Sequence, residues 1–222
     1  MQDTIMQEQP IDGFEFGTLK LVCRWRVFNR RLPMENRHIR ALGAREIDER
    51  PVSPALVAWA KQHLEWNLQD GATEFPNGVL LLVVDDEGKA AMSLGEYVPL
   101  SRTATRDLIE RAKGAWNEAR DTRVSPEDLW AVKDDTLIWG SSTNYIASAS
   151  SSLVCDLART WGMRIKRDES LIETVQDGSS KMDEVFLVSD EHGIVPASNK
   201  GGSRAKMFAA GYQKLLNSML IR

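Results

Sequence analysis

The sequence predicts an α+β fold, and two kinds of hydrophobic periodicity support this prediction. Apolar and polar side chains alternate through residues 17–28, which is typical of a half-buried strand. Val79–Val84 is an unbroken apolar run, of the kind found in strands that are buried on both faces. A period of three to four residues follows Ser53-Pro54, a capping residue and a proline suited to the first helical position.

The other elements follow in order along the chain. A short helix over Met34–Leu42 and a strand over Ala91–Val98 complete an α+β unit in the first hundred residues. Thr105 is a possible cap for a helix that extends to Ala119. Pro99–Thr103 is the best candidate for a connection, which predicts domains over residues 1–99 and 100–222. The later elements are strands at 129–132, 136–139, 163–166, 184–188 and 193–195, with helices over 153–161 and from 203 onward.

Composition excludes several classes of protein. The 222 residues include 28 Lys and Arg against 32 Asp and Glu, a net charge of −4, which argues against a nucleic-acid partner. No apolar run approaches the roughly 20 residues that cross a bilayer, so we expect no membrane insertion. Cys23 and Cys155 have no ligand-type neighbours and the histidines are scattered, so we expect free thiols and no metal site. The acidic, polar start Met1–Thr4 is unlike a secretory signal, which predicts a cytoplasmic protein.

The tract of small residues before Leu153 is the most informative segment. Backbone N–H groups at a helix start are unpaired and favour an anion, and small side chains let a phosphate approach. Ser150 and Ser151 would suit such a phosphate-cradling loop. A surface loop whose last serine only caps the helix is the alternative interpretation.

Two further segments are candidates for chemistry. Ser189 ends a strand that turns tightly into a second strand, which could place it near the serine tract; His192 reads better as a solvated turn residue than as an acid or base. A set of basic residues could present a fork to a phosphate or carboxylate, although such a set is usually a solvated helix face. This set comprises Arg30, Arg31, Arg37, His38 and Arg40. The acidic pairs Asp85-Asp86 and Asp134-Asp135 are best explained as turn formers.

Taken in order, these pieces resemble the class IV aminotransferase family, which includes branched-chain aminotransferases and aminodeoxychorismate lyases. Phe16–Lys20 is similar to the family's opening strand, and Arg37–Leu42 to its His-Leu-x-Arg-Leu helix. Gly140–Ile146 resembles its Glu-Gly-Ser-x-Ser-Asn-aromatic segment, and Ala149–Ala158 its Gly-Ile-Thr phosphate loop and helix. Asp183–Leu187 with Gly193–Pro196 is close to the family's Asp-Glu-Val-Phe-Leu…Gly-Val-Val-Pro ending.

The resemblance implies fold type IV of the pyridoxal-phosphate enzymes. It implies a small N-terminal α+β domain and a C-terminal mixed β domain with flanking helices, with pyridoxal 5'-phosphate held between them in a homodimer. A small amino or carboxylate substrate would lose and regain a proton at its α-carbon, with a lysine as imine partner and base. Carried over by position, the cofactor contacts would be Arg40, Asn144, Ser150, Ser151 and Ser189.

The chain departs from the family's pattern at several positions. Arg102 stands where the imine-forming lysine belongs, and a guanidinium is too basic and too delocalised to form that imine. Lys89, in an apparent turn, and Lys113, inside a helical pattern, could replace it only in a shifted alignment. Trp139 falls where a glutamate normally pairs the pyridine nitrogen, and Val188 where a threonine often helps to bind phosphate.

These departures leave alternative functions open. One is a pyridoxal-phosphate-dependent transaminase, or an aminodeoxychorismate-type lyase, acting on an amino acid or an amino-chorismate-like substrate. Another is a non-catalytic or cofactor-independent descendant that keeps the scaffold as a small-anion-binding or regulatory protein. A third is an enzyme that uses the same cleft for a phosphorylated or carboxylated ligand without the cofactor.

Overall fold

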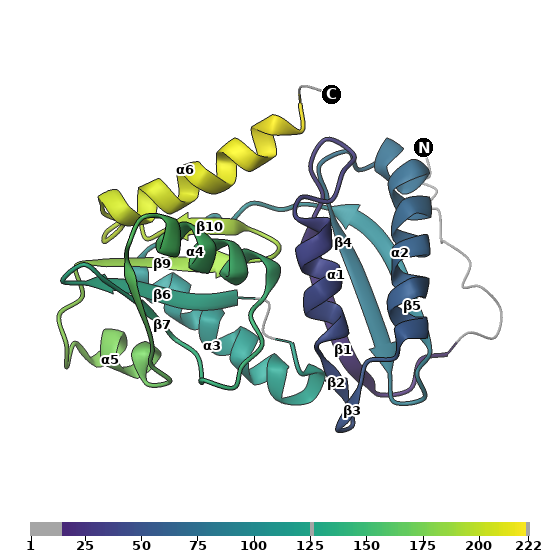
Figure 1. Cartoon of the computed structure of the whole chain (residues 1–222), viewed down its shortest axis with the longest axis horizontal. Coiled ribbons are helices and arrows are strands. Elements are labelled where there is room, and N and C mark those ends of the chain that lie inside the picture. The colour runs from purple at the N-terminus through teal and green to yellow at the C-terminus, as the bar shows by residue number, and fades with distance from the viewer. Residues whose placement is uncertain (1–14, 125–126, 221–222) are drawn as a thin grey trace, which may run out of the picture.

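The computed structural model describes residues 15–124 and 127–220, which form two main β-sheets with helices packed against both and one two-stranded hairpin (Figure 1). The first sheet is antiparallel, with strand order β1-β4-β5. Helices α1 and α2 cover one of its faces, and a small hairpin, β2–β3, lies between them in the chain. The bounds are β1 Leu19–Arg26, α1 Glu35–Gly43, β2 Glu46–Ile47, β3 Arg50–Pro51, α2 Pro54–Gln69, a 3-10 turn Gly71–Thr73, β4 Gly78–Asp85 and β5 Ala90–Glu96.

The second sheet has strand order β10-β9-β6-β7-β8, and all its pairings are antiparallel except that of β7 with β8. Helices α4 and α6 cover one face, where Trp130, Trp139, Phe186 and Phe208 stack into an aromatic core. Helices α3 and α5 cover the other face. The bounds are α3 Thr105–Thr122, β6 Glu127–Lys133, β7 Thr136–Trp139, α4 Ala149–Thr160, β8 Arg164–Arg167, α5 Leu171–Asp177, β9 Glu184–Ser189, β10 Gly193–Pro196 and α6 Ser203–Ser218.

The predicted α+β class is confirmed, and most predicted elements lie within a few residues of their observed bounds. In β4 only one face is fully buried: Leu80, Leu82 and Val84 enter the core, whereas residues 79, 81 and 83 are half-buried. The prediction of a strand buried on both faces is therefore corrected. The neighbouring turn prediction holds, because the Asp85 carboxylate accepts the N–H groups of Glu87 and Lys89.

Two helix starts differ from the predicted caps. Thr105 is the first residue of α3, and Ala104 holds the N-cap position. Helix α4 begins at Ala149, earlier than predicted, because the Ser148 hydroxyl accepts the N–H of Ser151 at 3.0 Å. The serine tract therefore forms the first turn of a helix.

The hairpin between β6 and β7 turns at Asp134 and Asp135, whose φ angles are 47° and 50°. Two consecutive positive φ angles belong to the tight turn whose twist matches that of antiparallel strands, and Asp tolerates this conformation. At the far edge of the same sheet, β8 points Arg164 and Lys166 into solvent and Ile165 toward the aromatic core.

Both cysteines are free thiols, as expected, and Cys23 is buried. Over the described ranges, no helix combines the length and apolar character that crossing a bilayer requires. No group of three metal-ligating side chains is found within those same ranges.

Candidate functional site

The N-terminus of α4 lies against the turn between β9 and β10, and α1 contacts the same turn. Asp190, the first residue after β9, places its carboxylate on this helix end. Its Oδ1 accepts the N–H of Ser150 at 2.8 Å, and its Oδ2 accepts the N–H of Ala149 at 3.4 Å. The helix end therefore holds an anion, as the serine tract predicted, but that anion belongs to the protein itself.

His38, on α1, completes this contact from the first sheet's side. Its side chain is 1% exposed, and its Nδ1 lies 3.4 Å from Oδ2 of Asp190. The ring also packs against Trp25 of β1, with 5.0 Å between ring centroids. Burial alone would raise the pKa of Asp190, but the charge of His38 and the hydrogen bond from the Ser150 N–H hold that pKa below its usual range.

A second buried carboxylate, that of Asp128 on β6, contacts the next residue of α4, Ser151. The Ser151 hydroxyl donates to Oδ2 of Asp128 at 2.6 Å, and both residues are almost completely buried. Burial raises the pKa of Asp128 to about 7, against the opposing effect of the Ser151 hydrogen bond. Asp128 is therefore an acid that gains or loses its proton near neutral pH.

A cavity of about 350 Å³ opens between α1 and α4, and we call it the arginine cleft. Four arginines and one acid line it: Arg37, Arg40, Arg159, Arg167 and Asp156. Arg37 is held by Asp156 at 2.8 Å and by the Ser152 hydroxyl at 3.0 Å. Arg167 lies over the ring of Trp139, 4.1 Å from its centroid, and donates to the Tyr145 carbonyl at 2.8 Å. Four positive charges against one negative charge leave the cleft with a net charge of +3.

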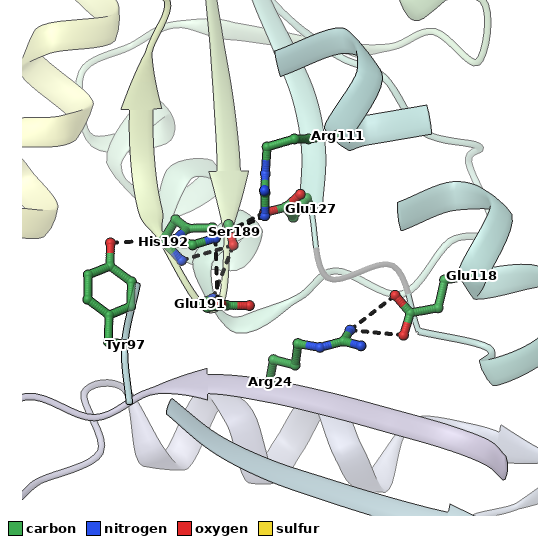
Figure 2. A network of polar contacts seen from close by, with 8 residues as sticks. All are labelled: Arg24, Tyr97, Arg111, Glu118, Glu127, Ser189, Glu191 and His192. Carbon is green, nitrogen blue, oxygen red and sulfur yellow. Dashed lines mark hydrogen bonds and ion pairs between the residues drawn. The ribbon is translucent and has the colours of Figure 1, made fainter. Parts of the chain in front are cut away.

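A third polar group surrounds the β9–β10 turn on the side that faces α3 and β1 (Figure 2). Arg111 donates to Oε1 of Glu127 at 2.6 Å and to Nε2 of His192 at 2.9 Å. Because arginine only donates, Nε2 accepts and Nδ1 carries the histidine proton, facing the Tyr97 hydroxyl at 3.5 Å. Arg24 of β1 pairs with Glu118 of α3 at 2.9 Å beside this group, so polar contacts also join the first sheet to α3.

The prediction that His192 is solvated is wrong, because its side chain is only 3% exposed. Burial, together with the charges of Arg111 and Arg26, lowers its pKa to about 4. The histidine is therefore neutral at physiological pH and serves as an acceptor for Arg111.

The structure brings together three of the five predicted cofactor contacts. Ser150 and Ser151 form the first turn of α4, and Ser189 lies beside Asp190, where its hydroxyl accepts the N–H of Glu191 at 3.1 Å and that of His192 at 3.0 Å. Arg40 lies on the rim of the arginine cleft, whereas Asn144 lies in an exposed turn between β7 and α4 and does not line that cleft.

The candidate lysines lie elsewhere. Lys89 follows the β4 turn and pairs with Glu87 at 2.9 Å, and Lys113 on α3 contacts Glu110 at 3.7 Å. Arg102, at the position that the resemblance gives to the imine lysine, is 76% exposed and faces Asp107. Sequence reasoning missed Asp190 and Asp128, because each is isolated among ordinary neighbours and acquires its partners only through the fold. His38 was a member of the predicted basic set, and in the structure it faces the Asp190 carboxylate and not a ligand.

Comparison with known proteins shows what this arrangement is similar to. No protein-family model and no curated protein matches the sequence. Among solved structures, a 4-amino-4-deoxychorismate lyase from Pseudomonas aeruginosa aligns with a TM-score of 0.54 and 17% identity over 87% of this chain and 90% of that one. A PLP-bound hypothetical aminotransferase from Mycobacterium tuberculosis aligns with a TM-score of 0.60 and 12% identity, over 96% and 95% of the two chains. A fold IV transaminase from Curtobacterium pusillum gives 0.57 and 13%, over 94% and 90%.

These alignments establish the fold. The chain has the fold of the class IV aminotransferases, the type IV fold of pyridoxal-phosphate enzymes, in a divergent sequence. Its structural neighbours include both aminotransferases and aminodeoxychorismate lyases.

The residues at the centre of this fold do not fit pyridoxal 5'-phosphate. The N–H groups of Ala149 and Ser150, which a cofactor phosphate would need, already donate to Asp190. No lysine lines the arginine cleft, as far as the described residues show, and none contacts Asp190. Trp139, where the family's glutamate is expected, packs in the aromatic core and carries no charge to pair a pyridine nitrogen.

Proposed function

We propose that this protein is a cofactor-independent relative of the class IV aminotransferases that binds a small anion in the arginine cleft. The observation that carries the proposal is the net charge of +3 in a cavity of about 350 Å³ between α1 and α4. The other interpretation is a pyridoxal-phosphate-dependent transaminase or lyase that acts on an amino acid or an amino-chorismate-like substrate. Such an enzyme would need a lysine to form the imine and a binding site for the cofactor phosphate. The homodimer and the cytoplasmic location stay predictions.

The cleft offers guanidinium groups in different states of pairing. Arg37 is oriented by Asp156 and Ser152, and this contact holds the pKa of the Asp156 carboxyl below its usual range. Arg40 is exposed on the cleft rim, and its guanidinium takes part in no hydrogen bond or ion pair with the described residues. A planar guanidinium recognises carboxylate and phosphate oxygens with paired N–H groups. Arg40 therefore offers a ligand a pair of N–H donors.

Arg167 defines the inner wall of the cleft. Its guanidinium is stacked on Trp139 and fixed by backbone carbonyls, so little side-chain entropy is lost when a ligand binds. Three uncompensated charges favour a ligand with two or more negative charges, such as a dicarboxylate or a phosphate monoester.

Calorimetric titration with inorganic phosphate, succinate and pyridoxal 5'-phosphate tests the proposal. We expect phosphate or succinate to bind the wild-type protein, and Arg40→Gln to weaken that binding at least tenfold. Arg50→Gln is the matched control, because Arg50 is an exposed arginine of β3, outside the arginine cleft.

Absence of binding by both anions would refute the proposal, as would equal affinity in the Arg40 and Arg50 variants. Pyridoxal 5'-phosphate is tested separately by absorbance. A yellow protein whose colour borohydride traps on one lysine would instead support the transaminase or lyase interpretation.

A further inference from the structure

We infer that Asp190 is an internal substitute for a ligand's phosphate group: its carboxylate permanently fills the anion site of α4, and removing it creates a site for small oxyanions. This inference does not depend on whether the arginine cleft binds a ligand. It concerns the buried N-terminus of α4, where Asp190 contacts Ser150 and His38.

The N–H groups at the start of α4 are fully used. A helix begins with N–H groups that have no partner within the helix and that normally attract an external acceptor. Here Ala149 and Ser150 donate to the two carboxylate oxygens of Asp190. Ser151 donates to the hydroxyl of Ser148, and Ser152 donates to the carbonyl of Ser148 at 2.9 Å. None of these four backbone N–H groups is left over for a ligand.

The surroundings of the Asp190 carboxylate are also those of a bound anion. The carboxylate lies against His38 on one side and the helix end on the other, and the residue is only 8% exposed. A phosphate brought to this place would meet the negative charge of Asp190 and, above neutral pH, that of Asp128. The site in the wild-type protein therefore rejects the anion that its helix would otherwise attract.

The turn that carries Asp190 is fixed from the other side. The carbonyl of Asp190 accepts the N–H of Arg26 at 2.9 Å, which ties the turn to the end of β1. Moving the carboxylate out of the helix end would require that this backbone contact, the His38 contact and two N–H bonds break together. The carboxylate is therefore a permanent part of the fold and not a gate that opens for a ligand.

Truncation of the side chain tests the inference directly. Asp190→Ala removes the carboxylate and leaves a cavity lined by two free N–H groups and His38, whereas Asp190→Asn keeps the volume but loses one of the two acceptors. Both variants should melt at a lower temperature than the wild type. Formate, which has the size of the missing group, and inorganic phosphate are the probes, with melting temperature as the readout.

We expect a saturating concentration of formate or phosphate to raise the melting temperature of Asp190→Ala by about 5 °C or more, a shift typical of ligand at about 100 times Kd. The same concentrations of formate or phosphate should not raise the melting temperature of Asp190→Asn, because its side-chain amide still fills the site. Asp190→Ala, Asp190→Asn and the comparison protein with Asp190 intact all carry Arg40→Gln, so that binding in the arginine cleft does not contribute. Failure of the cleft proposal would appear only in proteins with Arg40 intact, and the two results are separable.

Equal responses of the alanine and asparagine variants would overturn the inference, as would a wild-type protein that binds phosphate through the α4 N–H groups. If Asp190→Ala does not fold alone, refolding yield with and without formate replaces the melting temperature. Asp190→Ser, whose hydroxyl can accept one N–H bond, is the second variant and should show a smaller response. Refolding that formate does not improve, for either variant, would also count against the inference.

Discussion

Replacing Asp128 by asparagine should change how the free energy of unfolding depends on pH. Folding raises the pKa of Asp128 from 3.8 to about 7, so between these values the folded protein holds a proton that the unfolded chain has released. Stability from this residue is therefore greatest in acid and falls as pH rises toward the folded pKa. Between pH 5 and pH 8 the loss is about 3 kcal/mol, at about 1.4 kcal/mol for each pH unit up to the folded pKa.

His192 titrates in the opposite sense. Folding lowers its pKa from 6.5 to about 4, so between these values the unfolded chain binds the extra proton and stability rises with pH. The Arg111 side chain is 38% exposed, so solvent screening of its charge reduces this effect to about 1 kcal/mol between pH 5 and pH 8. The two residues oppose one another in the wild-type protein, and single substitutions separate them.

Urea unfolding at pH 5, 6, 7 and 8, followed by tryptophan fluorescence, gives the free energy of unfolding at each pH. Relative to the wild type, Asp128→Asn should gain about 3 kcal/mol between pH 5 and pH 8, because the amide cannot ionise and its oxygen still accepts from Ser151. His192→Gln should change in the other direction by about 1 kcal/mol. A stability difference between Asp128→Asn and the wild type that is constant across these pH values would refute the raised pKa.

Two further substitutions test the packing around the β9–β10 turn. Arg111→Met should cost about 3 kcal/mol in urea unfolding, because it removes the guanidinium that pairs with the buried carboxylate of Glu127; a change under about 0.5 kcal/mol would contradict this. Gly193→Ala should destabilise by about 1–3 kcal/mol more than Gly88→Ala, since both glycines have positive φ but only at Gly193 would a Cβ overlap the ring of Tyr212. Equal losses in melting experiments on the two variants would show that the ring can move aside.

More of the fold than of the candidate site could be predicted from the sequence. Local patterns located most of the strands and helices, because alternation and caps are properties of neighbouring residues. Helix α5 was not predicted, since its seven residues span two turns and bury only Leu171 and Ile172. The hairpin β2–β3 was missed for the same reason: each of its strands has two residues.

The site depends on contacts that no local pattern contains. The serine tract predicted an anion-attracting helix end, and the helix end does hold an anion. Its occupant, Asp190, lies 40 residues from Ser150 and looks like any acid after a strand. His192 was predicted to be solvated because turns usually are, but Arg111 and Tyr97, 81 and 95 residues away, cover it.

The charged side chains of β8 have a consequence for how molecules of this protein meet. An edge strand exposes unpaired backbone groups that can recruit the same strand of another molecule. Arg164 and Lys166 project from this edge, so two copies that approach edge to edge bring like charges together. Growth of the sheet from one molecule to the next is thereby opposed at β8.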